Sequence, residues 1–313
     1  MVTPLRFTLR QLQYFVGIVD HGTMAAAAQA CLVSQSAISL AIGEFERELG
    51  VQLFLRLGSS RRLTLTQAGR QVLGNARRVL DQLDELQATA RSVGQDIAGR
   101  LTVGCYPTLT PYILPRILQN FSEVYPSIEL DFIEGSVSDL YGRLTAGECE
   151  VAVMYRIGRM PEFDLRPLYH VRPHIILPLS HRFAGREKVR LSDLASEPFI
   201  MLNMPPSMSM FEDLFAEAGV APRVARVTTS PESVRALVAG GVGYSVLLNR
   251  AATTVAYDGD GYATAEIEEP VSVVEVVAVS PSYTHLTRRA QVFIEACAEL
   301  FATRQTPGTT TAH

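Results

Sequence analysis

Apolar residues recur at intervals of three and four along the first 30 residues, which predicts two short helices. The first begins after Thr8, which forms a capping-box pattern with Gln11, and it ends at Gly22, which favours a left-handed cap. Thr23 begins the second, at about 24–30, which consists almost wholly of alanine. Because alanine side chains are small, a neighbouring helix is expected to approach this one closely.

A third helix is predicted after a turn at 31–33, with Ser34 as its N-cap and Gly50 as its end. Its expected inward positions are Ala37, Ile38, Ile42, Phe45 and Leu49. Two short strands follow at 51–54 and 63–65, and the loop between them carries three arginines, Arg56, Arg61 and Arg62. Two helices joined by a tight turn, with a basic hairpin beside them, are typical of a winged helix-turn-helix.

A long helix is predicted from Thr66 to about Val93. Its apolar residues alternate steps of four and three, which is the spacing of a coiled-coil seam: Val72, Ala76, Val79, Leu83, Leu86, Ala90 and Val93. A seam this regular indicates that two chains pair through residues 72–93. The alternative is a single helix that packs against its own domain.

From residue 101 the pattern changes to strands that alternate with helices. Strand, helix, strand, helix and strand over 101–155 predict a parallel sheet with helices on its faces. A second series covers 174–247, and a long apolar strand at 271–279 and a closing helix at 284–301 follow. Two similar groups of this kind indicate a two-lobed clamshell.

These patterns divide the chain into predicted domains, with crossings between the lobes near 166–169 and 269–271. The domains are a winged helix-turn-helix at 1–66, a dimerising linker helix at 67–98, a two-lobed α/β domain at 99–302 and a flexible tail at 303–313. Within the two-lobed domain, lobe I is about 99–169 and 270–302, and lobe II is about 170–269.

Composition and charge narrow the function. The 313 residues are 47% hydrophobic and 19% charged, which predicts a sizeable packed core. No apolar run reaches the roughly 18 residues of a membrane helix, and the first residues lack a signal-peptide pattern, so we expect a cytoplasmic protein with no membrane partner. Residues 1–80 carry nine arginines and four acids, a balance of +5 within a net charge of −4. A basic first quarter on an acidic chain indicates that this end meets DNA.

The start of the third helix holds the predicted base-reading residues, because the first turn of a helix in the major groove approaches the base edges. Gln35 can bond adenine twice, Ser36 and Ser39 can donate or accept, and Ser34 can touch a phosphate while it caps the helix. The three hairpin arginines are the expected phosphate or minor-groove contacts. The alternatives are a solvated turn for the arginines and a plain surface role for Gln35.

Six short motifs carry a resemblance to a known family. They are LRQLQYFV at 9–16, AAAA at 25–28, VSQSAIS at 33–39, ERELGVQLF at 46–54, LTQAG at 65–69 and GRLTVG at 99–104. On these motifs the chain resembles the LysR-type transcriptional regulators. The resemblance implies a multidomain α plus α/β fold: a winged helix-turn-helix, a long dimerising linker helix and a two-lobed, periplasmic-binding-protein-like effector domain. It also implies tetramers on operator DNA. Ser36, Leu40 and Ala41 depart from the family pattern, so the recognition helix carries no positive charge before Arg47.

Loops at the carboxyl ends of the predicted strands form the candidate effector site, since ligands of α/β lobes bind there. Their hydroxyl and backbone N–H groups suit a small organic acid. The loops contribute Pro107, Tyr155 and Ser207, and by the resemblance Thr108, Ser136, Asn203 and Ser230 match positions that line an inducer cleft. Any of these serines could instead be only a helix cap. We expect operator DNA, a small-molecule inducer and RNA polymerase as partners, a homodimer or homotetramer, and no cofactor or metal.

The sequence also bears on three other functions. Four widely separated cysteines predict buried thiols, while a redox sensor would use Cys105 or Cys149 as its reactive thiol. A pyridoxal-phosphate enzyme needs a Schiff-base lysine, and the single lysine, Lys188, lies in a charged stretch expected to be exposed, so we expect no catalysis. A free-standing solute-binding protein is opposed by the first 90 residues.

Overall fold

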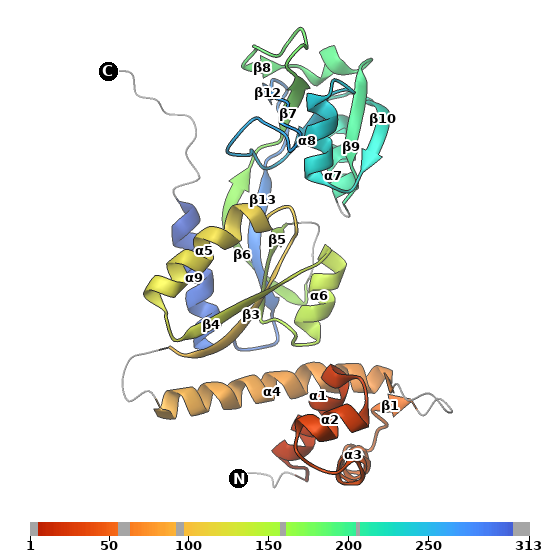
Figure 1. Ribbon diagram of the computed structural model, residues 1–313, viewed down its shortest axis with the longest axis vertical. Coiled ribbons are helices and arrows are strands. Elements are labelled where there is room, and N and C mark those ends of the chain that lie inside the picture. Colours follow the sequence, from red (N-terminus) through yellow and green to blue (C-terminus); the bar gives the residue numbers. More distant parts are fainter. Residues whose placement is uncertain (1–5, 56–62, 92–96, 157–160, 205–206, 303–313) are drawn as a thin grey trace.

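The computed structural model describes residues 6–55, 63–91, 97–156, 161–204 and 207–302. Helix α4 (Gln67–Arg91) lies between a group of short N-terminal helices and the first of two α/β lobes (Figure 1). Within the described ranges, no single helix is long and apolar enough to cross a membrane, and α2 and α3 reach that length and composition only as a pair bent by 108°. The predicted tail at 303–313 lies outside these ranges.

The N-terminal region contains the predicted three helices and hairpin. Thr8 and Thr23 each accept a hydrogen bond from the third backbone N–H of the helix that follows, at 3.3 and 3.1 Å. Gly22 and Gly50 end helices at φ of 75° and 70°, which L side chains rarely adopt. The elements are α1 (Leu9–His21), α2 (Met24–Ala30), α3 (Gln35–Leu49), β1 (Phe54–Leu55) and β2 (Thr64–Leu65), with β1 and β2 antiparallel.

The core of this region forms where α1, α2 and α3 meet. Phe15 and Phe45 are completely buried, with ring centroids 6.0 Å apart, and Ile38 and Ile42 pack beside them. The prediction that Ala37 faces inward is wrong, because this residue is exposed. Ile38, Ile42 and Phe45 already complete a stripe with steps of four and three, and Ala37 lies one residue to its side.

The apolar seam of helix α4 is buried in its first part and exposed in its second part. Thr66 caps the helix by accepting a hydrogen bond from the Gly69 backbone N–H at 2.8 Å. Near this end Ala76 is buried against the N-terminal helices, whereas Val79 and Leu86 are 40% and 64% exposed. The first part of the seam therefore packs on its own domain, and the second part presents apolar side chains to solvent. Val93 lies outside the described residues.

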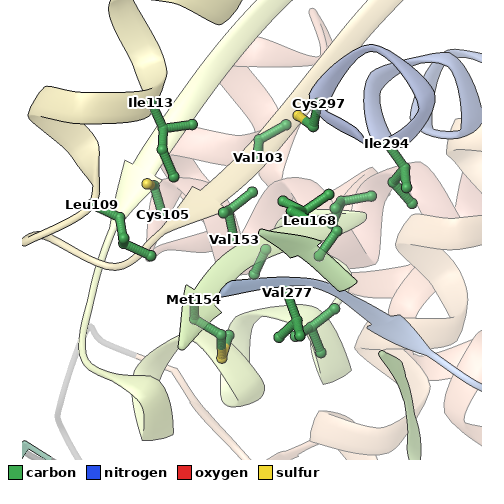
Figure 2. Close-up of a cluster of buried hydrophobic side chains, with 14 of the residues drawn as sticks. Val103, Cys105, Leu109, Ile113, Val153, Met154, Leu168, Val277, Ile294 and Cys297 are labelled. Atoms are coloured by element: carbon green, nitrogen blue, oxygen red, sulfur yellow. The ribbon is translucent and has the colours of Figure 1, made fainter. Parts of the chain in front are cut away.

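Lobe I is built on one mixed sheet with strand order β4-β3-β5-β13-β6. Strands β4, β3 and β5 are parallel as predicted, and β13 pairs antiparallel with both β5 and β6. The strands are β3 (Gly99–Cys105), β4 (Ile128–Glu134), β5 (Val151–Tyr155), β6 (Phe163–Val171) and β13 (Val274–Pro281). The helices are α5 (Thr110–Val124), α6 (Val137–Thr145) and α9 (Arg288–Ala302). Figure 2 shows part of the apolar core, where Val103 and Val153 of the sheet lie on the side of Ile113 and Ile294. Val277 and Met154, which are partners on β13 and β5, point to the other side of the sheet.

Lobe II holds two smaller sheets around a second core. One has strand order β11-β7-β12-β8 and the other pairs β9 with β10 in parallel. The strands are β7 (His174–Pro178), β8 (Lys188–Val189), β9 (Pro198–Leu202), β10 (Arg223–Thr228), β11 (Ser245–Leu247) and β12 (Tyr262–Ile267). The helices are the 3-10 turn η1 (Leu191–Leu194), α7 (Ser207–Glu217) and α8 (Pro231–Ala239).

Three strands, β6, β8 and β12, were not predicted, and local sequence explains why. β8 has only two residues, which are too few to show the alternating pattern of a strand. β6 occupies the segment that was interpreted as a crossing at 166–169, and it contains Pro167, which normally argues against a strand. It lies at the edge of the sheet, where a proline is tolerated because one side of the strand needs no ladder bond. β12 contains two alanines and Glu266, which are depleted in strands, and it follows Gly259 and Gly261. Its β-branched residues, Thr264 and Ile267, therefore form no clear strand pattern.

Candidate functional site

The turn between α2 and α3 sets the geometry of the N-terminal region. The two helices meet at 108°, within the roughly 90–120° of a helix-turn-helix. Leu32 occupies the turn with a φ of 55°, and its side chain is 93% exposed. The Val33 backbone N–H donates to the carbonyl of Ala28 at 2.9 Å, which closes the turn and fixes where α3 begins.

The first turns of α3 present a small, polar and uncharged face. Ser34 accepts a hydrogen bond from the Ala37 backbone N–H at 3.1 Å, and its hydroxyl lies 2.9 Å from that of Ser36. Ser34, Gln35, Ser36 and Ser39 are all exposed, so the three predicted base-reading residues and the predicted phosphate contact Ser34 are accessible at the start of α3. Ala37 lies among them and adds a methyl group of the kind that can contact thymine.

The basic hairpin loop lies outside the described residues, so Arg56, Arg61 and Arg62 are not placed. The strands that flank this loop are placed. The Glu46 carboxylate accepts hydrogen bonds from the backbone N–H groups of Leu53 and Phe54, at 2.7 and 3.2 Å. This side chain of α3 therefore holds the base of the hairpin against the recognition helix.

A cavity of about 220 Å³ lies between the two lobes. Its walls are mostly aromatic and aliphatic, with a few polar groups that converge from both sides. Lobe I contributes Tyr106, Pro107, Thr108, Pro111, Tyr112 and Tyr155. Lobe II contributes Leu202, Met210, Phe211, Arg235, Leu247 and Asn249, among others. A concave, mostly apolar space with a few fixed polar groups is the usual form of a small-molecule site.

Hydrogen bonds cross this cleft and join the lobes. The Asn249 amide donates to the Tyr155 hydroxyl at 2.6 Å and to the Thr108 carbonyl at 3.0 Å. The Thr108 and Tyr155 hydroxyls lie 3.1 Å apart, and the Tyr106 hydroxyl donates to the Met204 carbonyl at 3.2 Å. Burial raises the pKa of Tyr155 well above its usual range, so this hydroxyl stays neutral.

One charged group lies in the wall of the cleft. Arg235 is 4% exposed, and its guanidinium pairs with the Glu232 carboxylate one turn earlier on α8. The same guanidinium donates across the cleft to the Tyr112 hydroxyl at 2.8 Å. Burial raises the pKa of Tyr112, and the nearby Arg235 charge opposes part of that rise.

The predicted effector residues divide into two groups. Pro107, Thr108 and Tyr155 line the cavity, whereas Ser136, Asn203 and Ser230 are not among its lining residues. Ser136 caps α6 and Ser230 caps α8, as the alternative interpretation allowed, and the Asn203 backbone N–H donates to the Thr228 carbonyl at 2.7 Å. Ser207 begins α7, and its side chain lies outside the described residues.

Sequence reasoning missed Tyr112, Arg235 and Asn249 as cleft residues. The sequence does mark Arg235, because it lies on the buried face of α8 beside Val234 and Val238. A charged side chain on a buried face usually has a specific partner or function. Asn249 follows the short strand β11 in an irregular segment, and no local pattern marks it.

The thiols of the effector domain lie in its core. Burial raises the pKa of Cys105 and of Cys149 to about 12, and it raises that of Cys297 well above its usual range. Cys105 and Cys297 lie among apolar side chains in Figure 2. Thiols that stay protonated are poor nucleophiles, which argues against the redox interpretation for Cys105 and Cys149. Across the described residues, no group of three or more His, Cys, Asp or Glu side chains has the arrangement of a metal site.

Lys188, the only lysine of the sequence, is exposed on the two-residue strand β8. It is not among the residues that line the inter-lobe cavity. An enclosed Schiff-base site at this residue is therefore not supported.

Comparison with known proteins agrees with this architecture. The family model described as "Bacterial regulatory helix-turn-helix protein, lysR family" matches residues 9–70, and the one described as "LysR substrate binding domain" matches residues 94–302. The chain is 32% identical over 240 residues to the DNA-binding transcriptional dual regulator OxyR of Escherichia coli. The matched segment covers 76% of this chain and 78% of that protein.

Two solved structures extend the comparison to the whole fold. HinK, a LysR family transcriptional regulator from Pseudomonas aeruginosa, is 35% identical and covers 94% of this chain and 98% of its own, with a TM-score of 0.64. A full-length OxyR variant from the same organism has a TM-score of 0.78 over 98% of this chain and 100% of its own; at 24% identity it shows the shared fold alone. The chain belongs to the LysR family of DNA-binding transcriptional regulators, with a helix-turn-helix and an effector-binding domain.

Proposed function

We propose that this regulator controls transcription in response to a small organic acid that binds between the two lobes. The observation that supports this most is the cavity of about 220 Å³ crossed by the Asn249, Tyr155 and Thr108 hydrogen bonds. A ligand in this space would touch both lobes at once and change how tightly they close. Family members are transcriptional regulators, not enzymes, and we propose a non-catalytic, cytoplasmic role here.

We further propose that Gln35, Ser36 and Ser39 read bases and that Ser34 touches a phosphate. Arg56, Arg61 and Arg62 would supply backbone or minor-groove contacts. An uncharged recognition face gives modest base discrimination, so much of the affinity would come from phosphate contacts. Exposed Val79 and Leu86 support pairing of two chains through residues 72–93. Dimers would associate into tetramers on operator DNA, with RNA polymerase as a further partner.

The DNA-binding part is tested by comparing Gln35→Ala with Arg62→Ala on an operator selected from a random DNA pool. Gln35→Ala should lose roughly 1–3 kcal/mol of binding free energy on the operator and little on random DNA. Arg62→Ala should weaken both and lower the slope of log affinity against log salt by about one. Equal losses from Gln35→Ala on both DNAs would contradict the base-reading role.

The effector part is tested by a thermal-shift screen of metabolites, because a ligand that binds only the folded state raises the melting temperature. Each ligand found is then added to the operator-binding assay. A ligand that raises the melting temperature, changes operator affinity and loses affinity in Thr108→Ala supports the proposal. Ligands that act equally on wild type and Thr108→Ala would place the effector outside the cleft.

Peroxide sensing is the second candidate, since proteins named "Hydrogen peroxide-inducible genes activator" are among the relatives at 32% identity. The buried Cys105, Cys149 and Cys297 oppose it, because their raised pKa values keep the thiols protonated. Operator binding measured before and after peroxide treatment decides between the two. A change that disappears in Cys105→Ser or Cys149→Ser would favour the thiol mechanism.

A further inference from the structure

The Arg235–Glu232 pair in the cleft wall is unusual in how unequally its two members are buried. Arg235 is 4% exposed, while the side chain of Glu232 is 39% exposed. A guanidinium stays charged at all ordinary pH values, so its burial has to be offset by an anion. Among the residues that the structure describes, Glu232 is the carboxylate that forms an ion pair with Arg235.

The two side chains also differ in how firmly they are held. The Arg235 guanidinium donates to the Tyr112 hydroxyl at 2.8 Å and to the Asn249 carbonyl at 3.4 Å, so it is tied to both lobes. Glu232 lies in the first turn of α8, next to solvent, and a carboxylate released there regains its hydration at little cost. Glu232 is therefore the replaceable member of the pair, and Arg235 is the fixed one.

We propose that Arg235 is the anchor for a carboxylate of the effector, and that this carboxylate displaces Glu232 from the guanidinium. This inference rests on the proposed function and deepens it. The exchange of one carboxylate for another keeps Arg235 paired throughout, so no buried charge is left alone. A neutral molecule of the same shape cannot replace Glu232 without leaving the arginine uncompensated, and the cleft would reject it on that ground.

The rest of the cavity limits what carries the carboxylate. At about 220 Å³ the space is smaller than the roughly 300–1,000 Å³ of most ligand pockets. Tyr106, Pro111 and Phe211 provide flat or apolar walls, and the Tyr155 and Asn249 groups are already bonded to each other. The ligand class is a small monocarboxylate with one ring or a branched apolar body.

The test uses the full-length protein and its Glu232→Gln variant, which leaves the Arg235 charge without its carboxylate. Benzoate and acetate are the probes, and benzamide and acetamide are their neutral counterparts, at equal ionic strength. Melting temperature is measured for each combination. Acetate is small enough to reach Arg235 even where a ring does not fit. Glu266→Gln is the matched control, because Glu266 pairs with the half-exposed Arg250 at 3.9 Å in the same lobe.

Glu232→Gln should melt at a lower temperature than wild type, and carboxylates should restore part of the loss. The rise caused by benzoate or acetate should be larger in Glu232→Gln than in wild type or Glu266→Gln, and the amides should have no such effect. Arg235→Gln should lower benzoate affinity roughly ten- to hundredfold. Because Glu232→Gln carries the test by itself, a misfolded Arg235→Gln protein does not block it.

The inference is overturned if Glu232→Gln responds to neither carboxylate, or responds equally to carboxylates and amides. Its failure is distinguishable from failure of the proposed function. Suppose that a neutral or cationic ligand of the cleft regulates operator binding equally in wild type and Arg235→Gln. The role of Arg235 as an anchor would then be refuted, whereas effector control of operator binding would stand. Suppose instead that carboxylates selectively stabilise Glu232→Gln but no small molecule alters operator binding. Arg235 would then be a carboxylate site, and effector control of operator binding would be refuted.

Discussion

The two ends of the lobe I sheet meet very different surroundings. At the carboxyl ends of its parallel strands lies the inter-lobe cleft, which is mostly apolar. Neutral hydrogen bonds of Asn249 cross it, together with one charged contact from Arg235 to Tyr112. At the amino ends lies a cavity of about 640 Å³ between lobe I, helix α4 and the N-terminal helices. Charged side chains line this second space: Asp20, Asp81, Asp84, Glu148 and Glu150 with Arg77, Arg100 and Arg289.

A single buried strand joins the two regions. β5 starts directly after Glu150 at the charged junction and ends at Tyr155 in the cleft, and all five of its residues are buried. Closely packed interiors transmit displacement, so a shift at one end of β5 is felt at the other. The contrast teaches that the cleft is suited to select a ligand by its shape and by the single buried Arg235 charge. The junction, with many charged side chains, is suited to respond to pH and salt.

The largest expected effect comes from the buried ion pair of the junction. Arg289 is buried, and its Nε donates to the Glu150 carboxylate at 3.2 Å. Arg289→Met would leave that carboxylate without its cation and should lower the free energy of unfolding by roughly 3–5 kcal/mol, measured by urea denaturation. The neighbouring Arg288→Met is the control, because the exposed Arg288–Glu295 pair at 3.8 Å should contribute less than about 1 kcal/mol. Equal losses would mean that the junction is not held by a buried charge pair.

A pH effect follows from Asp81 on the α4 side of the junction. Burial, with a further contribution from Glu150, raises the pKa of Asp81 from 3.8 to about 7, while Arg289 and Arg77 oppose the rise. The folded protein therefore holds this proton more tightly than the unfolded chain does. Stability from this group is present below about pH 4 and is lost as the pH rises to 7.

Asp81→Asn keeps the side chain neutral, so its advantage over wild type should grow with pH. The difference in free energy of unfolding between variant and wild type should increase by roughly 2 kcal/mol from pH 5 to pH 8. Asp84→Asn, at an exposed position on the same helix, removes only a minor contribution to the raised pKa of Asp81, so its change over that range should be clearly smaller. The same pH profile in both variants would remove Asp81 as the responsive group.

The next prediction concerns the close backbone contact between Gly74 of α4 and Thr145 of lobe I. A Cβ at Gly74 would lie 2.1 Å from the Thr145 carbonyl oxygen, so Gly74→Ala has to push α4 away from lobe I. We expect a loss of about 2 kcal/mol in unfolding experiments, despite the better helix propensity of alanine. Gly43→Ala on α3 has no neighbouring atom within 4 Å and should be neutral or stabilising by up to about 1 kcal/mol. If both variants gain stability, α4 and lobe I are not in contact in solution.

The sequence predicted best what depends on neighbouring residues. Thr8, Thr23 and Ser34 were identified as caps because a cap bonds only to the next few backbone groups. The winged helix-turn-helix and the two-lobed fold were predicted from local patterns and from the family motifs, and both are confirmed.

The cleft was predicted only in part, because it is formed by contacts distant in sequence. The Asn249–Thr108 hydrogen bond joins residues 141 positions apart, and Arg235 meets Tyr112 across 123. Ser136 and Ser230 were grouped with the cleft from their places after strands, but their hydroxyls cap helices. A hydroxyl in a strand-to-helix loop can do either, and only the lobe packing decides.

The smallest expected effect lies in the cleft and tests one of its neutral hydrogen bonds. Tyr155→Phe removes the hydroxyl that accepts from the Asn249 amide at 2.6 Å, and should cost about 1 kcal/mol in unfolding free energy. Because both groups are uncharged, the loss should be the same at low and high salt, unlike that of Arg289→Met. Tyr141→Phe, which keeps its ring contact with Phe163, is the control and should stay within about 0.5 kcal/mol. A loss at Tyr155 that shrinks with added salt would show that this bond depends on nearby charge, and the contrast between a neutral bond in the cleft and an ion pair at the junction would then be wrong.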